Sequence, residues 1–138
     1  MERDEAADAL EDARRWFNVS MLAGEHVDYN IGLYSLEMSV EIALKGVLTK
    51  FDITYPKVHD IIPLIVKLFN EKNSKLPKEL VENENLIIDT FRELLKRREP
   101  AGYTFNSNIK IADLKGDFNT YSKAAEKIIK LCLKAIGN

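Results

Sequence analysis

Residues 28–51, DYNIGLYSLEMSVEIALKGVLTKF, carry the pattern that decides the fold. Their apolar side chains recur with three- and four-residue spacing on two stripes. One stripe holds Leu33, Leu36, Val40, Ala43, Leu44, Val47, Leu48 and Phe51, and the other holds Ile31, Tyr34, Met38 and Ile42. Only a narrow strip of Glu37, Glu41 and Lys45 is charged. A helix that is apolar over most of its circumference is expected at the centre of a bundle or at a subunit interface.

The composition favours an all-helical domain. The 138 residues include only 6 Gly and 4 Pro, about 7% where about 12% is typical, which leaves few breakers for the turns of an all-β fold. The lone cysteine, Cys132, excludes an internal disulfide and indicates a reducing compartment. The acidic start (MERDEAADAL) and the absence of an apolar run of roughly 18 residues predict a cytoplasmic protein without a membrane span.

The remaining periodicity predicts one domain, residues 1–138, built as an up-and-down bundle of four to five helices. A helix is expected before the central one, ending at Gly24, and Asp28 is expected to cap the central helix. Asp60 is expected to cap the third helix, with Pro63 in its first turn. The five expected helices cover about residues 3–23, 28–51, 60–71, 78–98 and 117–136, with an irregular stretch at 99–116 and Gly137 as the last stop.

Several kinds of site are excluded by their missing motifs. The chain contains no GxGxxG, GxxxxGK[ST] or GxSxG, and His26, His59 and Cys132 lack metal-ligand spacing, so we expect no cofactor and no metal. Residues 1–60 have a net charge of −6 and residues 61–138 one of +4, with the basic excess near 92–98 and 115–134. This asymmetry allows a local anionic partner, although a solvated helix surface explains it too.

Arg98 is the unusual residue, because it continues the face of Ile87, Phe91 and Leu94. A guanidinium group carried toward a core must be paired or must meet an anion, and its fork suits a phosphate. The alternative to phosphate binding is a structural role, in which Arg98 donates to the last carbonyls of its helix or to a carboxylate such as Glu41.

Three other candidates have purely structural explanations. Arg97 follows Glu93 by four residues and is expected to form an exposed pair. His59 is expected to be a capping or solvent-exposed residue. Glu41–Lys45 has the i, i+4 orientation that supports a helix, which is as good an explanation as a functional role.

The chain resembles the HEPN domain family (higher eukaryotes and prokaryotes nucleotide-binding), of the stand-alone prokaryotic type. Glu37, Val40-Glu41 and Ala43-Leu44-Lys45 are similar to that family's signature helix, His59-Asp60-Ile61 to the opening of its third helix, and Arg98 with Pro100 to the end of its fourth. The resemblance spans about residues 6–136. It implies a bundle like the substrate-binding subunits of nucleotidyltransferases, paired two-fold through the central helices. Members act beside a small nucleotidyltransferase, bind nucleotides, or cleave RNA as toxins.

RNA-cleaving members of that family use an Arg, four to six residues, and then a His. In this chain Tyr103 stands five positions after Arg98, and Phe105 stands where some toxins have a Tyr. Tyrosine, with an ordinary pKa of about 10, is a poor substitute for histidine near neutral pH. The resemblance therefore favours a binding module over an enzyme, with the phosphate-binding half of the site retained, and leaves the question of an activity open.

The predicted function is a homodimeric module that binds a nucleotide or RNA phosphate and acts with a partner such as a minimal nucleotidyltransferase. The expected ligand-binding residues are Arg97, Arg98, Tyr103, Glu41, Lys45 and His59, and no catalytic residue is assigned. One alternative is a metal-independent, toxin-type endoribonuclease that uses Arg98 with Tyr103 or a displaced His59. The other is a dimeric scaffold in which Arg98 only closes an ion pair.

Overall fold

The computed structural model describes residues 4–137 and confirms the all-α class, since these residues form helices and no strand. The helices are α1 (Glu5–Glu25), α2 (Tyr29–Lys50), α3 (Ile62–Glu71), α4 (Lys78–Glu82), α5 (Glu84–Gly102) and α6 (Lys115–Gly137). Three 3-10 turns join them, η1 (Asn73–Lys75), η2 (Thr104–Asn106) and η3 (Ile111–Leu114).

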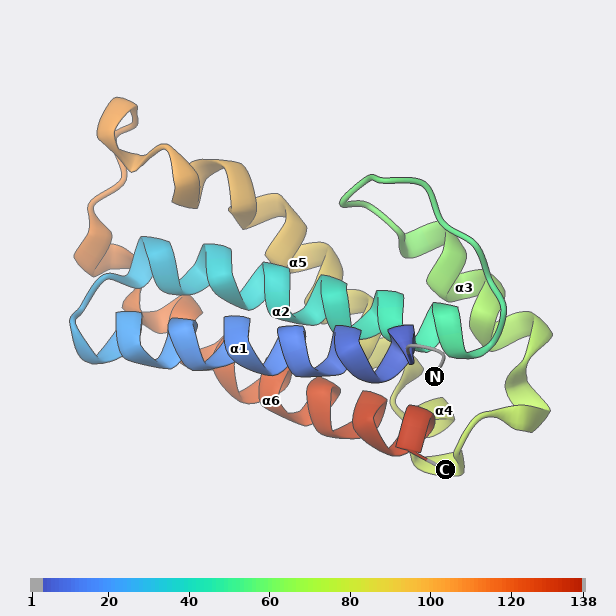
Figure 1. The fold of residues 1–138 in the computed structure, drawn as a ribbon. Helices are drawn as coiled ribbons and strands as arrows, with labels where there is room; N and C mark the ends of the chain where they lie inside the picture. The colour runs from blue at the N-terminus through green and yellow to red at the C-terminus, as the bar shows by residue number, and fades with distance from the viewer. Residues whose placement is uncertain (1–3, 138) are drawn as a thin grey trace.

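The central position of α2 is also confirmed. It packs against α1, α5 and α6, and these long helices run along the bundle while α3 and α4 close one end (Figure 1). The first stripe of α2 is buried, with Leu36, Val40 and Val47 completely inaccessible to solvent. Burial of so many large apolar side chains around one helix is the main stabilising term of the fold.

Gly24 does not end the first helix, which runs on to Glu25. Its lack of a side chain serves close packing instead, because a Cβ on Gly24 or on Gly32 would lie 2.5 Å from the ring of Phe118. The chain turns at Val27, which takes a left-handed conformation with φ of 55°. Arg3, the predicted start of this helix, lies outside the described residues.

The starts of the next two helices agree with the sequence patterns. Tyr29 follows Asp28 directly, although the Asp28 side chain makes no capping bond. The third helix begins at Ile62, whose N–H donates to Oδ1 of Asp60 at 3.1 Å, and Pro63 lies in its first turn. Asp60 therefore satisfies a free backbone donor from two residues before the helix, but the N-cap position predicted for it belongs to Ile61.

The helix predicted over 78–98 begins at Lys78 as expected, but it is two helices rather than one, and the second runs beyond residue 98. The break lies at Asn83, whose side-chain amide donates to the carbonyl of Glu79 at 2.8 Å, and α5 continues through Pro100 to Gly102. A proline in the last turn removes one N–H and bends only the helix end, while the buried Ala101 anchors that turn. The irregular stretch is consequently shorter than expected, from Tyr103 to Leu114, and Gly137 is the last residue of α6 rather than a stop after it.

Within residues 4–137, none of the helices combines the length and the apolar composition needed to cross a bilayer.

Candidate functional site

The charged strip of α2 faces the interior of the molecule. The Glu37 side chain is 0% exposed and that of Glu41 is almost as fully buried. Two carboxyl groups one helical turn apart in a core must hold protons or cations, because an isolated buried charge is strongly unfavourable. Their partners define the candidate site.

Arg98 crosses from α5 to α2 to meet the first of these carboxyl groups. Its side chain is only 18% exposed, as its place on the apolar face predicted. Nη1 donates to Oε1 of Glu37 at 3.2 Å and to the sulfur of Met38 at 3.1 Å, and Nη2 donates to the Tyr34 hydroxyl at 2.7 Å. The guanidinium carbon also lies 4.4 Å from the centre of the Tyr34 ring. The carboxylate partner is thus Glu37, where the sequence suggested Glu41.

Glu41 holds two other side chains in place. Its Oε2 accepts from Lys45 at 2.9 Å, and Oε1 lies 3.0 Å from Nδ1 of His59. Lys45 also donates to the carbonyl of Val58 at 2.8 Å, which ties the loop before α3 to α2. His59 is 54% exposed, so it is partly in solvent as expected, but it is bound to a buried carboxylate and does not cap a helix.

Glu37 keeps a proton at neutral pH. Burial, together with the hydrogen bond and the negative charge of Glu41, raises the pKa of Glu37 to about 8, and these effects outweigh Arg98, which lowers it. Oε2 of Glu37 is buried and has no hydrogen-bond partner among the described residues. A neutral Glu37 accepts the Arg98 hydrogen bond but leaves the positive charge of Arg98 uncompensated.

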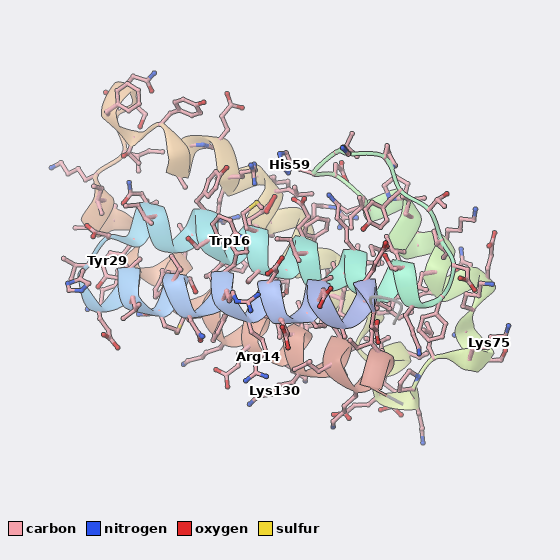
Figure 2. The ribbon with its side chains drawn as sticks, in the orientation of Figure 1. Arg14, Trp16, Tyr29, His59, Lys75 and Lys130 are labelled. Atoms are coloured by element: carbon pink, nitrogen blue, oxygen red, sulfur yellow. The ribbon has the colours of Figure 1, made fainter. Side chains whose placement is uncertain are left out.

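A pocket of about 510 Å³ opens beside this cluster. It brings together Arg98, His59 and Tyr103, three of the residues singled out in the sequence, and Tyr103 forms its exposed rim. His59 lies on the loop that leads into α3, on the side of α2 along which α5 runs (Figure 2). The pocket is lined by Tyr34, His59, Asp60, Leu95, Arg98, Glu99 and Tyr103.

Arg97 lies apart from this pocket. Its Nε donates to Asp117 at 2.9 Å, its Nη1 reaches Glu93 at 3.2 Å, and its guanidinium lies 4.8 Å from the centre of the Tyr121 ring. The expected pair with Glu93 is therefore confirmed, and Asp117 adds a second carboxylate. These contacts direct the charge of Arg97 toward α6, and only Arg98 faces the pocket.

The comparison with family models decides the family. The model described as HEPN domain matches residues 6–136, nearly the whole chain. The chain belongs to the HEPN domain family. Comparisons with curated proteins and with solved structures give no significant match. Family membership makes the protein a nucleotide- or RNA-related module in general terms.

Two residues of this HEPN domain's candidate site, Tyr34 in the pocket lining and the buried Glu37 that binds Arg98, were not among the expected ligand-binding residues. Tyr34 belongs to the second apolar stripe of α2, and Glu37 to its charged strip, so neither is distinguishable from a structural residue by spacing. The one usable signal was Arg98 itself, because a guanidinium on an apolar face requires a buried acceptor. Cys132 is fully buried, and burial raises the pKa of its thiol to about 12, which agrees with a core role and not a nucleophilic one.

Glu37, Glu41 and His59 also offer three ligand atoms that lie within 4.8 Å of one another, the kind of group that can hold a metal ion. Sequence spacing did not predict this group. Arg98 and Lys45 already bind the two carboxyl groups, and two fixed cations oppose the entry of a third. The arrangement suits a shared proton better than a metal ion.

Proposed function

We propose that this HEPN domain binds a phosphate group of a nucleotide or RNA in the pocket beside Arg98. The observation that carries the proposal is the state of Arg98, which is held by Tyr34 and by a protonated Glu37 and so keeps its full positive charge. Bonds within the described residues use three of its five N–H donors. A fixed guanidinium with free donors at the edge of a pocket is a strong ligand for phosphate.

The other pocket residues would have distinct roles. Tyr103, on the rim, would contact the base or sugar of the bound nucleotide. Glu41 and Lys45 would act as positioning residues, because they hold His59 and the loop around it. Arg97 would not touch the ligand.

We also propose that the protein works as a homodimer with a nucleotidyltransferase-type partner, in the reducing environment of the cytoplasm. The support for the dimer is the second apolar stripe of α2, where Ile31 is 52% exposed and Tyr34, Met38 and Ile42 are only partly covered. An apolar stripe left at the surface of a central helix is typical of a protein interface.

The direct experiment is isothermal titration with ATP, GTP and a short RNA. We expect saturable binding by the wild-type protein and at least a tenfold loss in Arg98→Ala, with Arg98→Lys in between because it keeps charge but loses the fork. Arg92→Ala is the matched control, since Arg92 lies on the same helix and is exposed. A folded wild-type protein that binds none of these ligands would contradict the proposal and favour the scaffold role.

A second candidate function is metal-independent cleavage of RNA, favoured by the position of His59. With Nδ1 donating to Glu41, Nε2 is free to accept a proton. It would take the proton of a 2′-hydroxyl while O2′ attacks the adjacent phosphorus. The P–O5′ bond would break and the leaving O5′ would take a proton from water, giving a 2′,3′-cyclic phosphate and a 5′-hydroxyl. Arg98 would stabilise the charge on the phosphate.

The cleavage candidate is tested by incubating RNA with the protein in EDTA. We expect cyclic-phosphate ends that disappear in His59→Gln and persist in His26→Gln, the exposed histidine of the α1–α2 turn. They should also persist in Tyr103→Phe, since the proton acceptor is His59. Intact RNA with wild-type protein would reject cleavage and leave binding as the function.

A further inference from the structure

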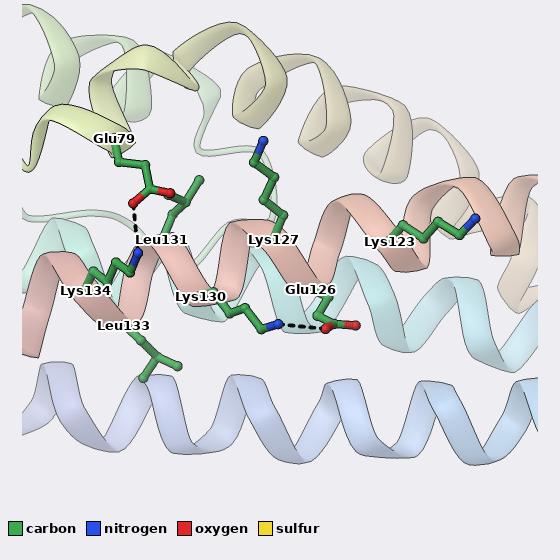
Figure 3. A pocket seen from close by; sticks show the side chains of 8 residues that line it. All are labelled: Glu79, Lys123, Glu126, Lys127, Lys130, Leu131, Leu133 and Lys134. Atoms are coloured by element: carbon green, nitrogen blue, oxygen red, sulfur yellow. Dashed lines mark hydrogen bonds and ion pairs between the residues drawn. The ribbon is translucent and has the colours of Figure 1, made fainter.

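A separate hollow of about 550 Å³ lies along α6, away from the Arg98 pocket. Four lysines line it at positions 123, 127, 130 and 134, and Figure 3 shows them projecting from α6, with Lys127 toward the α4–α5 side and Lys130 toward α1. We call this set (Lys123, Lys127, Lys130 and Lys134) the lysine track.

The track continues onto α1. An adjoining hollow of about 400 Å³ shares Lys130 and Leu133 with the first and adds Arg14 and Phe17 of α1. Arg14 and Lys130 lie close together where α1 meets α6 (Figure 2). The combined groove therefore contains five cationic side chains.

Its two carboxylates do not neutralise these cations. Glu126 binds Lys130 at 2.9 Å and Glu79 binds Lys134 at 2.8 Å. Arg14, Lys123 and Lys127 form no ion pair with any other residue between 4 and 137. The groove holds five cations and two carboxylates, so it carries a net positive charge that attracts polyanions.

The spacing of the track matches an extended polyanion better than a single ion. Lysines four, three and four residues apart lie on one side of a helix and span about 17 Å at 1.5 Å per residue. This length is enough for the four lysines to contact several successive phosphates of one strand.

The walls of the groove favour nucleic acid over peptide. They are helices, whose backbone groups are already bonded, so an extended peptide would find no strand edge to pair with. The lining also contains Phe17 and Leu133, partly exposed apolar side chains that can contact base faces while the lysines bind phosphates.

We propose that the lysine track binds the backbone of a single-stranded nucleic acid, independently of the Arg98 pocket. The track explains the positive charge of the second half of the chain, and it provides a surface for a polymer where the Arg98 pocket provides one for a single phosphate.

The test is fluorescence anisotropy with a fluorescein-labelled U12 oligonucleotide. Lys123→Glu/Lys127→Glu should weaken binding at least tenfold, while Lys67→Glu/Lys110→Glu, exposed lysines outside the groove with the same change of net charge, should stay within about threefold. The salt dependence of wild-type binding should have a slope of about −2 to −3 on a log–log plot. The four substituted lysines are exposed, so the variants should fold, and circular dichroism is the check on folding.

Three results would overturn the proposal. They are a wild-type protein that does not bind U12, equal weakening in both double variants, and competition by poly-glutamate as effective as that by unlabelled U12. Titration with ATP separates this proposal from the one on Arg98. Lys123→Glu/Lys127→Glu should keep ATP binding, and Arg98→Ala should keep most U12 binding, so either proposal can fail alone.

Discussion

Nη1 of Arg98 on α5 lies 3.2 Å from Oε1 of Glu37 on α2, although the two residues are 61 positions apart in the chain. The carboxyl group of the pair is completely buried. Burial, together with the neighbouring Glu41, raises the pKa of Glu37 to about 8, so at neutral pH this contact is a hydrogen bond between a neutral acid and a cation. Arg98 is therefore fixed in position without losing its charge. The binding site that we propose for this HEPN domain depends on that combination.

The first prediction concerns stability and pH. The pKa of Glu37 is 4.5 when unperturbed and about 8 in the folded protein, so the folded state binds the proton more tightly. This contribution to stability is complete below about pH 4.5 and is lost as the pH rises through 8. Urea unfolding between pH 6 and 9 should show the decline in the wild type and a flatter profile in Glu37→Gln. Glu71→Gln, an exposed control, should follow the wild type.

The second prediction concerns affinity and pH. When Glu37 ionises it cancels the charge of Arg98, so affinity for ATP should fall severalfold between about pH 7 and pH 9. In Glu37→Gln the amide reproduces the neutral acid, and the affinity should change little over this range. Equal pH dependence in both proteins, measured by titration calorimetry, would mean that Glu37 does not control Arg98.

The third prediction separates two adjacent arginines. Arg97→Ala should reduce stability by at most about 1 kcal/mol, because its pairs with Glu93 and Asp117 are partly exposed, and should leave ATP affinity unchanged. Arg98→Ala should have the opposite profile, with ATP affinity as the main loss. A large loss of ATP binding in Arg97→Ala would place the ligand on the α6 side.

The fourth prediction tests the packing of α1 and α2 on α6. Gly32→Ala should destabilise the protein by about 1–3 kcal/mol, because the new Cβ would lie 2.5 Å from the Phe118 ring. Gly116→Ala is the control, since a Cβ there meets nothing within 4 Å, and it should be neutral or slightly stabilising. Thermal unfolding measures both, and equal melting temperatures would contradict the packing.

The fifth prediction concerns the dimer. Ile31→Asp places a charge on the exposed apolar stripe of α2 and should convert the protein to a monomer in size-exclusion chromatography with light scattering. Val66→Asp, an exposed apolar residue of α3, should leave the dimer intact. A wild-type protein that elutes as a monomer would contradict the proposed homodimer.

Periodicity was sufficient for the central helix and for the third, whose patterns are strong and whose ends carry Asp28, Asp60 and Pro63. Rules for glycine and proline were less reliable, because Gly24 serves contact with Phe118 and Pro100 lies in a last turn that tolerates it. Both outcomes depend on tertiary packing that local sequence does not encode.

The candidate site was predicted only in part, again because tertiary packing is not encoded in local sequence. Arg98 was identified because one helix face can be drawn from sequence, whereas its partner on α2 and the bond from His59 to Glu41 bring together residues that are distant in the chain. Arg97 and Arg98 are adjacent in sequence and face different helices, which only the packing of α5 against α2 and α6 determines.

The central claim is that Arg98 itself holds the phosphate. The most direct measurement is a titration of ¹⁵N-labelled protein with ATP, observed at the arginine Nε–Hε signals, with Arg98→Lys used to assign Arg98. The account predicts a saturable shift of the Arg98 signal while that of Arg97, bound to Asp117, stays in place. An unmoved Arg98 signal at saturating ATP, or a shift confined to Arg97, would contradict it.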